Sequence, residues 1–246
     1  MIDGTDSQMP EGGMGDTTPQ RVPGGDGGEG HICAHADLLE QNLNDANRFI
    51  ETIGAGTPEG ALFEMRFIPP QGVQVKGRSG VWGETFSLDD VAQVVEAAAN
   101  ANRDGTNVYL CPHPVWAATG KNGTACDDDI ISAHWQYADF DDKASVDNYY
   151  EFISENPEFE PTFRVITGTN PHERFHAYWR LKEPSDDLNL FRAVQRQIAA
   201  RFKSDKVVVN PSRVLRIPGF ISWPSRKKLI ERGYVPELVK PDWRQS

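Results

Sequence analysis

The hydrophobic and polar positions of the chain follow two periods, one typical of helices and one typical of strands. Apolar residues at helical spacing predict helices over residues 38–54, 87–98, 144–154 and 185–202. Short apolar or alternating runs predict strands over residues 61–68, 108–110, 135–142, 163–166, 175–181 and 214–217, and a glycine-punctuated hairpin over 73–86. Helices and strands are mixed without regular βαβ repetition, which predicts an α+β fold.

Helix boundaries are predicted from the residues that flank these patterns. Gly54 should end the first helix. Ser87 should cap the second helix, with Asp90 at the position where a capping box usually has Glu. Tyr149, Tyr150 and Phe152 fall at helical spacing, so we expect core packing rather than a base-stacking platform.

The first 30 residues differ in composition from the rest of the chain. They contain nine glycines, three prolines and six acidic residues against Arg21 alone, with little apolar content. Such a segment cannot bury enough apolar surface to offset the entropy lost on ordering. The prediction is a disordered acidic tail over residues 1–30 and one domain over 31–246.

Charge is distributed unevenly along the 246 residues. The formal net charge is −11, but residues 201–246 hold eleven Lys and Arg against four acids. A basic C-terminal fifth is compatible with a polyphosphate or nucleic-acid surface, although Arg226, Lys227 and Lys228 also fit an ordinary solvated run. With no apolar run near the ~18 residues that span a bilayer, and no signal-like N-terminus, we expect a cytoplasmic protein without a membrane partner.

Three cysteines are too few and too irregularly spaced for a disulfide framework. Two clusters contain potential zinc ligands, namely His31-x-Cys33-x-His35 and Cys111-x-His113 with Cys126. Neither has CxxC spacing, so we expect reduced thiols and no bound zinc.

The strand over residues 135–142 ends in the pair of carboxylates with the clearest chemical implication. Asp139 and Asp141 are two residues apart, so a strand places them on the same face. Two carboxylates this close repel one another unless a cation lies between them. The spacing predicts a Mg²⁺ or Mn²⁺ site.

Further candidate residues follow in a meaningful order. His176 lies in the HAYW strand after a glycine-containing turn, and Asp205 opens the segment DKVVVNPSRVLRIPGF, which contains Arg213 and Arg216. Carboxylates hold cations that bridge phosphate oxygens, and imidazole and guanidinium groups take the remaining negative charge. Together these side chains predict a site for a nucleoside triphosphate. No G-x-x-x-x-G-K-[ST] sequence is present, so a P-loop is not expected.

The order of apolar-DxD, glycine turn with HxYW, and D…SRVLRIPG resembles the archaeo-eukaryotic primase superfamily, in particular the RepB-like primases and primase-polymerases of plasmids and phages. The resemblance extends over about residues 35–228 and includes the segment NANRDGTNVY at 100–109. It implies an archaeo-eukaryotic primase-like catalytic core with an RRM-like sheet. Its specificity comes from three motifs in order, because each motif alone is weak.

The resemblance also implies roles for individual residues. Asp139, Asp141 and Asp205 would be catalytic and would bind the metal ions. His176 would contact the phosphates of the incoming nucleotide, and Arg213 and Arg216 would bind phosphate or support the site. This sequence departs from the usual pattern in three places: GTNPHERF replaces a glycine-richer turn, Asn210 replaces a second acid, and FISWPSRKK replaces the commoner PGTxNxK.

The implied function is primer synthesis on single-stranded DNA by two-metal nucleotidyl transfer from NTPs or dNTPs. Partners would be the DNA template, the nucleotide, and a separate helicase or replication protein. Three alternatives stay open at this point: a non-enzymatic plasmid or phage initiator that binds origin DNA, a DxD metal-dependent glycosyltransferase, and a degenerate primase domain that binds nucleotide without polymerising.

Overall fold

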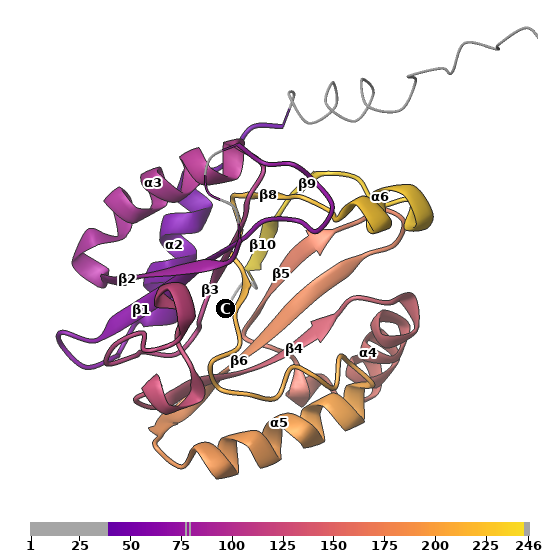
Figure 1. Cartoon of the computed structure of the whole chain (residues 1–246). Coiled ribbons are helices and arrows are strands. Elements are labelled where there is room, and N and C mark those ends of the chain that lie inside the picture. Colours follow the sequence, from indigo (N-terminus) through magenta and orange to yellow (C-terminus); the bar gives the residue numbers. More distant parts are fainter. Residues whose placement is uncertain (1–38, 77, 79, 244–246) are drawn as a thin grey trace, which may run out of the picture.

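The computed structural model describes residues 39–76, 78 and 80–243, in which two four-stranded antiparallel sheets, a two-stranded sheet and five α-helices surround a shared core (Figure 1). The helices are α2 (Leu43–Gly54), α3 (Val91–Arg103), α4 (Lys143–Glu155), α5 (Leu188–Phe202) and α6 (Arg226–Arg232). The strands are β1 (Leu62–Ile68), β2 (Trp82–Ser87), β3 (Asn107–Leu110), β4 (Ala133–Phe140), β5 (Phe163–Gly168), β6 (Arg174–Ser185), β7 (Leu215–Arg216), β8 (Ile221–Ser222), β9 (Glu237–Leu238) and β10 (Lys240–Trp243). The α+β prediction is confirmed.

The first sheet has the strand order β2-β1-β3-β7, and the second has the order β10-β5-β6-β4. Helices α2 and α3 lie together beside the first sheet, and α4 and α5 lie along the second (Figure 1). Helix α2 also reaches the second sheet, because the Phe49 ring lies 5.9 Å from the Phe163 ring and 5.8 Å from the Tyr178 ring. One hydrophobic core therefore joins the two sheets.

Strand β4 presents different residues on its two faces. Trp135 and Tyr137 point into the core between the sheets, and Asp139 follows on the same face. Ala138 and Phe140 point the other way, against a second apolar cluster built with α4 and α5. The alternation that predicted the strand therefore also places Asp139 on the face toward the first sheet.

The free edge of β4 is covered by the α5 helix and the loop after it. The Gln195 amide, which is buried, donates to the Tyr137 carbonyl at 2.9 Å and accepts from the Tyr137 N–H at 3.2 Å. The Asp205 N–H then donates to the Asp139 carbonyl at 3.0 Å. An uncovered edge would leave backbone groups unpaired, so these contacts both close the sheet and bring the 205 loop to the end of β4.

The PGF turn after β7 depends on glycine. Gly219 has φ +86°, and a Cβ there would lie 2.1 Å from the Asn42 carbonyl oxygen. The Asn42 N–H donates to the Gly219 carbonyl at 2.9 Å, directly before α2 begins. Only glycine combines the left-handed conformation with such a close backbone approach.

Several predicted boundaries are wrong. The hairpin over 73–86 is absent, because β2 pairs directly with β1, and the residues described between 71 and 81 form no strand. The helix expected from residue 185 begins at Leu188, since the Asp187 carboxylate caps it by accepting from Asn189 and Leu190 N–H groups. The Ser87 hydroxyl does not cap α3, because it accepts no backbone N–H of the helix. It donates to the Asp90 carboxylate at 3.0 Å instead, and a short 3₁₀ turn precedes the helix.

Other differences are omissions. Helix α6 and strands β8, β9 and β10 were not predicted, because each is short and carries no apolar periodicity of its own. Residues 1–30, and the His31-x-Cys33-x-His35 cluster, lie outside the described residues. Within the described part of the chain no helix is long and apolar enough to cross a membrane.

Candidate active site

Asp139 and His176 are neighbours across two strands of the second sheet. They occupy paired positions of β4 and β6, and His176 Nε2 lies 3.7 Å from Asp139 Oδ1. Among the described residues, no group donates a hydrogen bond to the Asp139 carboxylate, and His176 Nδ1 is buried without a partner. A buried polar group normally has a partner, so this pair is incompletely satisfied as it stands.

Asp141 lies one residue beyond the end of β4 and is surrounded by basic groups. Lys228 Nζ, from α6, lies 3.1 Å from Asp141 Oδ2, and Arg174 Nε, at the start of β6, lies 3.8 Å from Oδ1. The Asp141 carbonyl contacts the Tyr234 hydroxyl at 3.5 Å and His172 Nε2 at 3.2 Å. The third acid of the DFDD run, Asp142, has a structural use, because its side chain caps α4.

The Arg174 side chain is fixed by contacts with several neighbouring residues. Its guanidinium donates to Glu237 at 3.1 Å and lies 4.0 Å from the centre of the Tyr234 ring. It also donates to the Asn170 carbonyl in the turn before β6. Gly168 makes room for it, since a Cβ there would lie 1.9 Å from an Arg174 nitrogen.

Asp205 reaches the site through its backbone rather than its carboxylate. Its N–H bonds the Asp139 carbonyl, whereas its side-chain Oδ1 accepts from the Val207 N–H at 2.9 Å. Its charge is nevertheless close enough to raise the pKa of Asp139. The set of three carboxylate ligands therefore stays a prediction.

The two arginines of the RVLR segment differ in their surroundings. Arg216 donates to Asn107 Oδ1 at 2.5 Å and lies 4.9 Å from the centre of the Tyr109 ring. Its charge acts on both Asp139 and His176. Arg213 instead donates to the Val207 carbonyl and supports the 205–213 loop.

The electrostatics of the site follow from burial and charge proximity. Burial, and then the charges of Asp141 and Asp205, raise the pKa of Asp139 from 3.8 to about 7. Burial, and then the nearby Arg216 charge, lower the pKa of His176 to about 3. His176 is consequently a neutral imidazole at physiological pH, able to exchange hydrogen bonds but carrying no charge.

A divalent metal ion fits the donors at the end of β4. Carboxylates are hard oxygen ligands, and Mg²⁺ is commonly held by one or two of them together with water and substrate phosphates. Asp139 and Asp141 supply that number, and the Asp139 carboxylate accepts no hydrogen bond from the described residues, which leaves its oxygens available to a cation. Within residues 39–76, 78 and 80–243, no three His, Cys, Asp or Glu side chains form a ready metal cluster, so waters or phosphates would complete the coordination.

Sequence reasoning missed the basic partners of Asp141. Lys228 was interpreted as part of a solvated triplet, and its partner lies 87 residues away in the chain. His172, in the turn before β6, is half-buried and contacts the Asp141 carbonyl. The Arg226–Lys228 run after a WPS turn was the available signal, because it follows the RVLR segment closely.

The second cysteine–histidine cluster does not form one unit. Cys111 and His113 are buried in the core, where burial raises the pKa of the Cys111 thiol to about 12 and lowers that of His113 to about 3. Cys126 is a free thiol that contacts Thr119 and Asp129. These side chains serve packing and loop structure.

Comparison with solved structures identifies the fold as that of archaeo-eukaryotic primase catalytic domains. The chain is similar to the primase RepB′ (TM-score 0.55, 15% identity, covering 83% of this chain and 56% of that one). It is also similar to the primase domain of the cyanophage S-2L primase-polymerase (TM-score 0.53, 19% identity, covering 82% and 90%). A structure of the RepB′ catalytic domain with initiator DNA matches with TM-score 0.51 at 15% identity, covering 81% and 84%.

The chain thus spans little more than half the length of the full RepB′ structure. No protein-family model matches the sequence, and no curated protein matches it significantly. The fold predicted from the order of the motifs is confirmed by these structural likenesses.

Proposed function

We propose that this chain is a primase or primase-polymerase catalytic domain, which joins nucleotides on a single-stranded DNA template. The observation that carries the proposal is the pair Asp139 and Asp141 at the end of β4, in a primase fold, facing basic groups from three other elements. Arg174, Arg216 and Lys228 provide positive charge around the two acids, as a triphosphate requires.

Each residue has a role in this proposal. Asp139 and Asp141 hold the divalent metal, with Asp205 as the third acid once its carboxylate turns from Val207. A bound Mg²⁺ or Mn²⁺ would supply Lewis-acid stabilisation of the attacking and leaving oxygens. Lys228, which pairs with Asp141 in this structure, adds positive charge where a pyrophosphate would leave.

His176 and the arginines complete the nucleotide site. The neutral imidazole of His176 has its Nε2 on the Asp139 side of the site, from where it would donate a hydrogen bond to a phosphate oxygen. Arg216, fixed by Asn107 and Tyr109, adds a permanent charge beside it. Arg213 maintains the loop that carries Asp205.

A primer-synthesis assay tests the proposal. Wild-type protein, single-stranded template, labelled NTPs or dNTPs, and Mg²⁺ or Mn²⁺ should yield primers, and Asp139→Ala should reduce incorporation by at least about a hundredfold. Asp147→Ala is the matched control, because Asp147 is a surface acid of α4 whose one ion pair among the described residues is with Lys143. Its incorporation rate should equal that of the wild type.

The same assay separates the alternatives. Sequence-specific duplex binding by a wild type that incorporates nothing would favour the initiator, and nucleotide-sugar turnover would favour the glycosyltransferase. Nucleotide binding without incorporation would indicate a degenerate primase domain. Normal incorporation by Asp139→Ala would refute the assigned site.

A further inference from the structure

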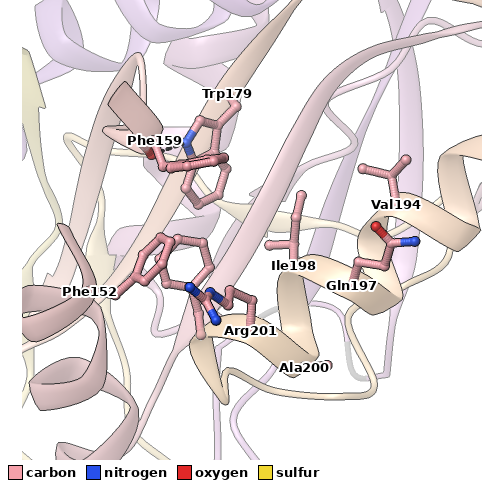
Figure 2. Close-up of a pocket in the computed structure, with 9 residues that line it drawn as sticks. Phe152, Phe159, Trp179, Val194, Gln197, Ile198, Ala200 and Arg201 are labelled. Carbon is pink, nitrogen blue, oxygen red and sulfur yellow. Dashed lines mark hydrogen bonds between the residues drawn. The ribbon is translucent and has the colours of Figure 1, made fainter. Parts of the chain in front are cut away.

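An open apolar cavity of about 820 Å³ lies on the outer side of the second sheet, between α4 and α5. Figure 2 shows Phe152, Phe159 and Trp179 on one side of it and the α5 residues Val194 and Ile198 on the other. Its size is within the range of ligand-binding sites. The remaining lining residues are Gln197, Ala200, Arg201 and Phe202.

This cavity and the candidate active site lie on opposite faces of the sheet. Trp179 packs with the cluster that holds Ala138 and Phe140, whereas Asp139 and His176 project from the alternate positions of the same strands. A molecule bound in the cavity therefore leaves the active site open to nucleotide and template.

The cavity exposes apolar surface that the chain does not cover within its described residues. The Phe159 side chain is 51% exposed, although its backbone carbonyl is fixed by Trp179 Nε1 at 2.8 Å. Phe152 packs edge-to-face against Phe202, with ring centres 5.0 Å apart. A contiguous, rigid aromatic wall of this kind is typical of an interaction site.

Arg201 is the one charged side chain that lines the cavity. Its guanidinium lies 4.4 Å from the centre of the Phe152 ring, and within the described ranges it forms no ion pair or hydrogen bond. Lys203 lies in the adjoining hollow on the α5 side, and Glu151 and Glu155 lie there on the α4 side. Arg201 borders both hollows and, within the described ranges, forms no ion pair with Glu151 or Glu155, so its charge is available to a ligand carboxylate that enters the apolar cavity.

We propose that the cavity docks an amphipathic helix of a partner protein, with large apolar side chains inserted and a carboxylate on Arg201. Helices bind apolar grooves through residues at i, i+3, i+4 and i+7. A nucleobase fits less well, because Gln197 is the only lining group other than Arg201 with free polar atoms for its edges. The inference is independent of the proposed catalytic function.

Three synthetic helical peptides test the proposal on the full chain by fluorescence anisotropy. They share a Leu/Phe face and differ only at its flanking positions, which are Glu, Gln or Lys. For the wild type we expect the Glu peptide to bind most tightly, about fivefold or more above the Lys peptide. Non-specific attraction predicts the reverse order, because the protein carries a net charge of −11.

Two exposed positions provide variants that should fold normally. Arg201→Glu should invert the order of the Glu and Lys peptides, and Phe159→Ala should weaken the Glu peptide about tenfold. Arg196→Glu, on the exposed side of α5 and outside the cavity lining, is the matched control and should bind like the wild type. Priming should be unchanged in all three variants.

Several outcomes would overturn the proposal. They are tighter binding of the Lys peptide to the wild type, no effect of Arg201→Glu, and binding of single-stranded oligonucleotide that is lost in Phe159→Ala while the peptides do not bind. Concentration-dependent dimerisation abolished by Phe159→Ala would also overturn it, because a second copy would then be the occupant.

Discussion

Two halves of the same face of β4 are built in opposite ways. In the first half, Trp135 is 1% exposed, donates to the Ile53 carbonyl at 3.0 Å and packs edge-on against Phe163. Tyr137, two residues on, donates its hydroxyl to the Asn210 carbonyl at 2.8 Å. The polar groups of Trp135 and Tyr137 both have partners, although the buried hydroxyl of the neighbouring Tyr178 has none among the described residues. This half is therefore mainly a packed aromatic region that contributes to stability.

In the second half, the same strands place polar groups that are left unsatisfied. Asp139 has a raised pKa, and its carboxylate accepts no hydrogen bond from the described residues; His176 Nε2 lies 3.7 Å away, and His176 Nδ1 has no partner there. A chain optimised for stability alone would place apolar residues there. Local cost retained beside a well-packed region is typical of a functional site, and under the proposed function a bound ligand would supply the missing partner.

The largest expected effect falls on the packed half. Trp135→Ala should lower the free energy of unfolding by about 3–5 kcal/mol, because it removes a large buried ring and leaves a cavity. Urea unfolding followed by circular dichroism measures this change. If the variant does not fold, Trp135→Phe should retain most of the packing and incorporate nucleotides at the wild-type rate. A loss below 1 kcal/mol would contradict the assigned role of this half.

The opposite sign is expected at Asp139. In the metal-free protein at pH 8, Asp139→Asn should raise the free energy of unfolding by roughly 1–4 kcal/mol, because it removes a carboxylate whose ionisation the fold opposes. The native pKa of about 7 lies above the ordinary 3.8, so the native state binds the extra proton between those values. The contribution of Asp139 to the free energy of unfolding is therefore most favourable at low pH, and it is lost as the pH rises from about 4 to about 7.

The gain of the variant should accordingly be small near pH 4, grow up to about pH 7 and then level off. Millimolar Mg²⁺ at pH 8 should stabilise the wild type and leave Asp139→Asn unchanged, since a ligand that binds only the native state stabilises it. Urea unfolding across this pH range, with and without chelator, measures both effects. If the difference in unfolding free energy between the two proteins does not change with pH, the pKa of Asp139 is not raised in the folded state.

Gln195 lies at the boundary of the two halves. Gln195→Leu should cost roughly 1–3 kcal/mol, because it leaves the Tyr137 N–H and carbonyl and the Val208 carbonyl without their bonds. It should also weaken Mg²⁺ binding, since the same edge brings Asp205 to Asp139. Gln197→Leu is the matched control, because Gln197 lies two residues further along α5 and is exposed. If the two variants bind Mg²⁺ with equal affinity, the contacts of Gln195 at the edge of β4 do not influence the metal site.

The comparison also explains what the sequence could predict. The apolar residues of β4 alternate between its two faces, and local periodicity needs no knowledge of the rest of the chain, so the strand and the inward face of Asp139 followed from it. The prediction that Asp141 shares this strand face is not confirmed, because the strand ends at Phe140. The proximity of Asp205 to Asp139 depends on a backbone bond made through α5, which no local pattern encodes. The motif order supplied that proximity only by resemblance.

The basic side of the site was the least predictable part. Lys228 sits on a seven-residue helix without buried residues, and its run of charges looks like any solvated surface. Arg174 likewise depends on Glu237 and Tyr234, which come from the last 13 residues of the chain. Charge pairs between distant segments leave no periodic signal, so only the assembled fold shows them.

The smallest expected effect distinguishes Lys228 as a substrate-binding residue from Lys228 as a structural one. Lys228→Gln should raise KM for the nucleotide about tenfold with a smaller change in kcat, because it removes one charge from the phosphate site. A nucleotide titration of primer synthesis measures both constants. Lys227→Gln is the matched control, because its only ion pair in the described chain is the exposed one with Glu231 at 3.9 Å. If Lys228 serves only to hold Asp141, its loss should instead change the Mg²⁺ concentration required for activity and leave KM for the nucleotide as it was.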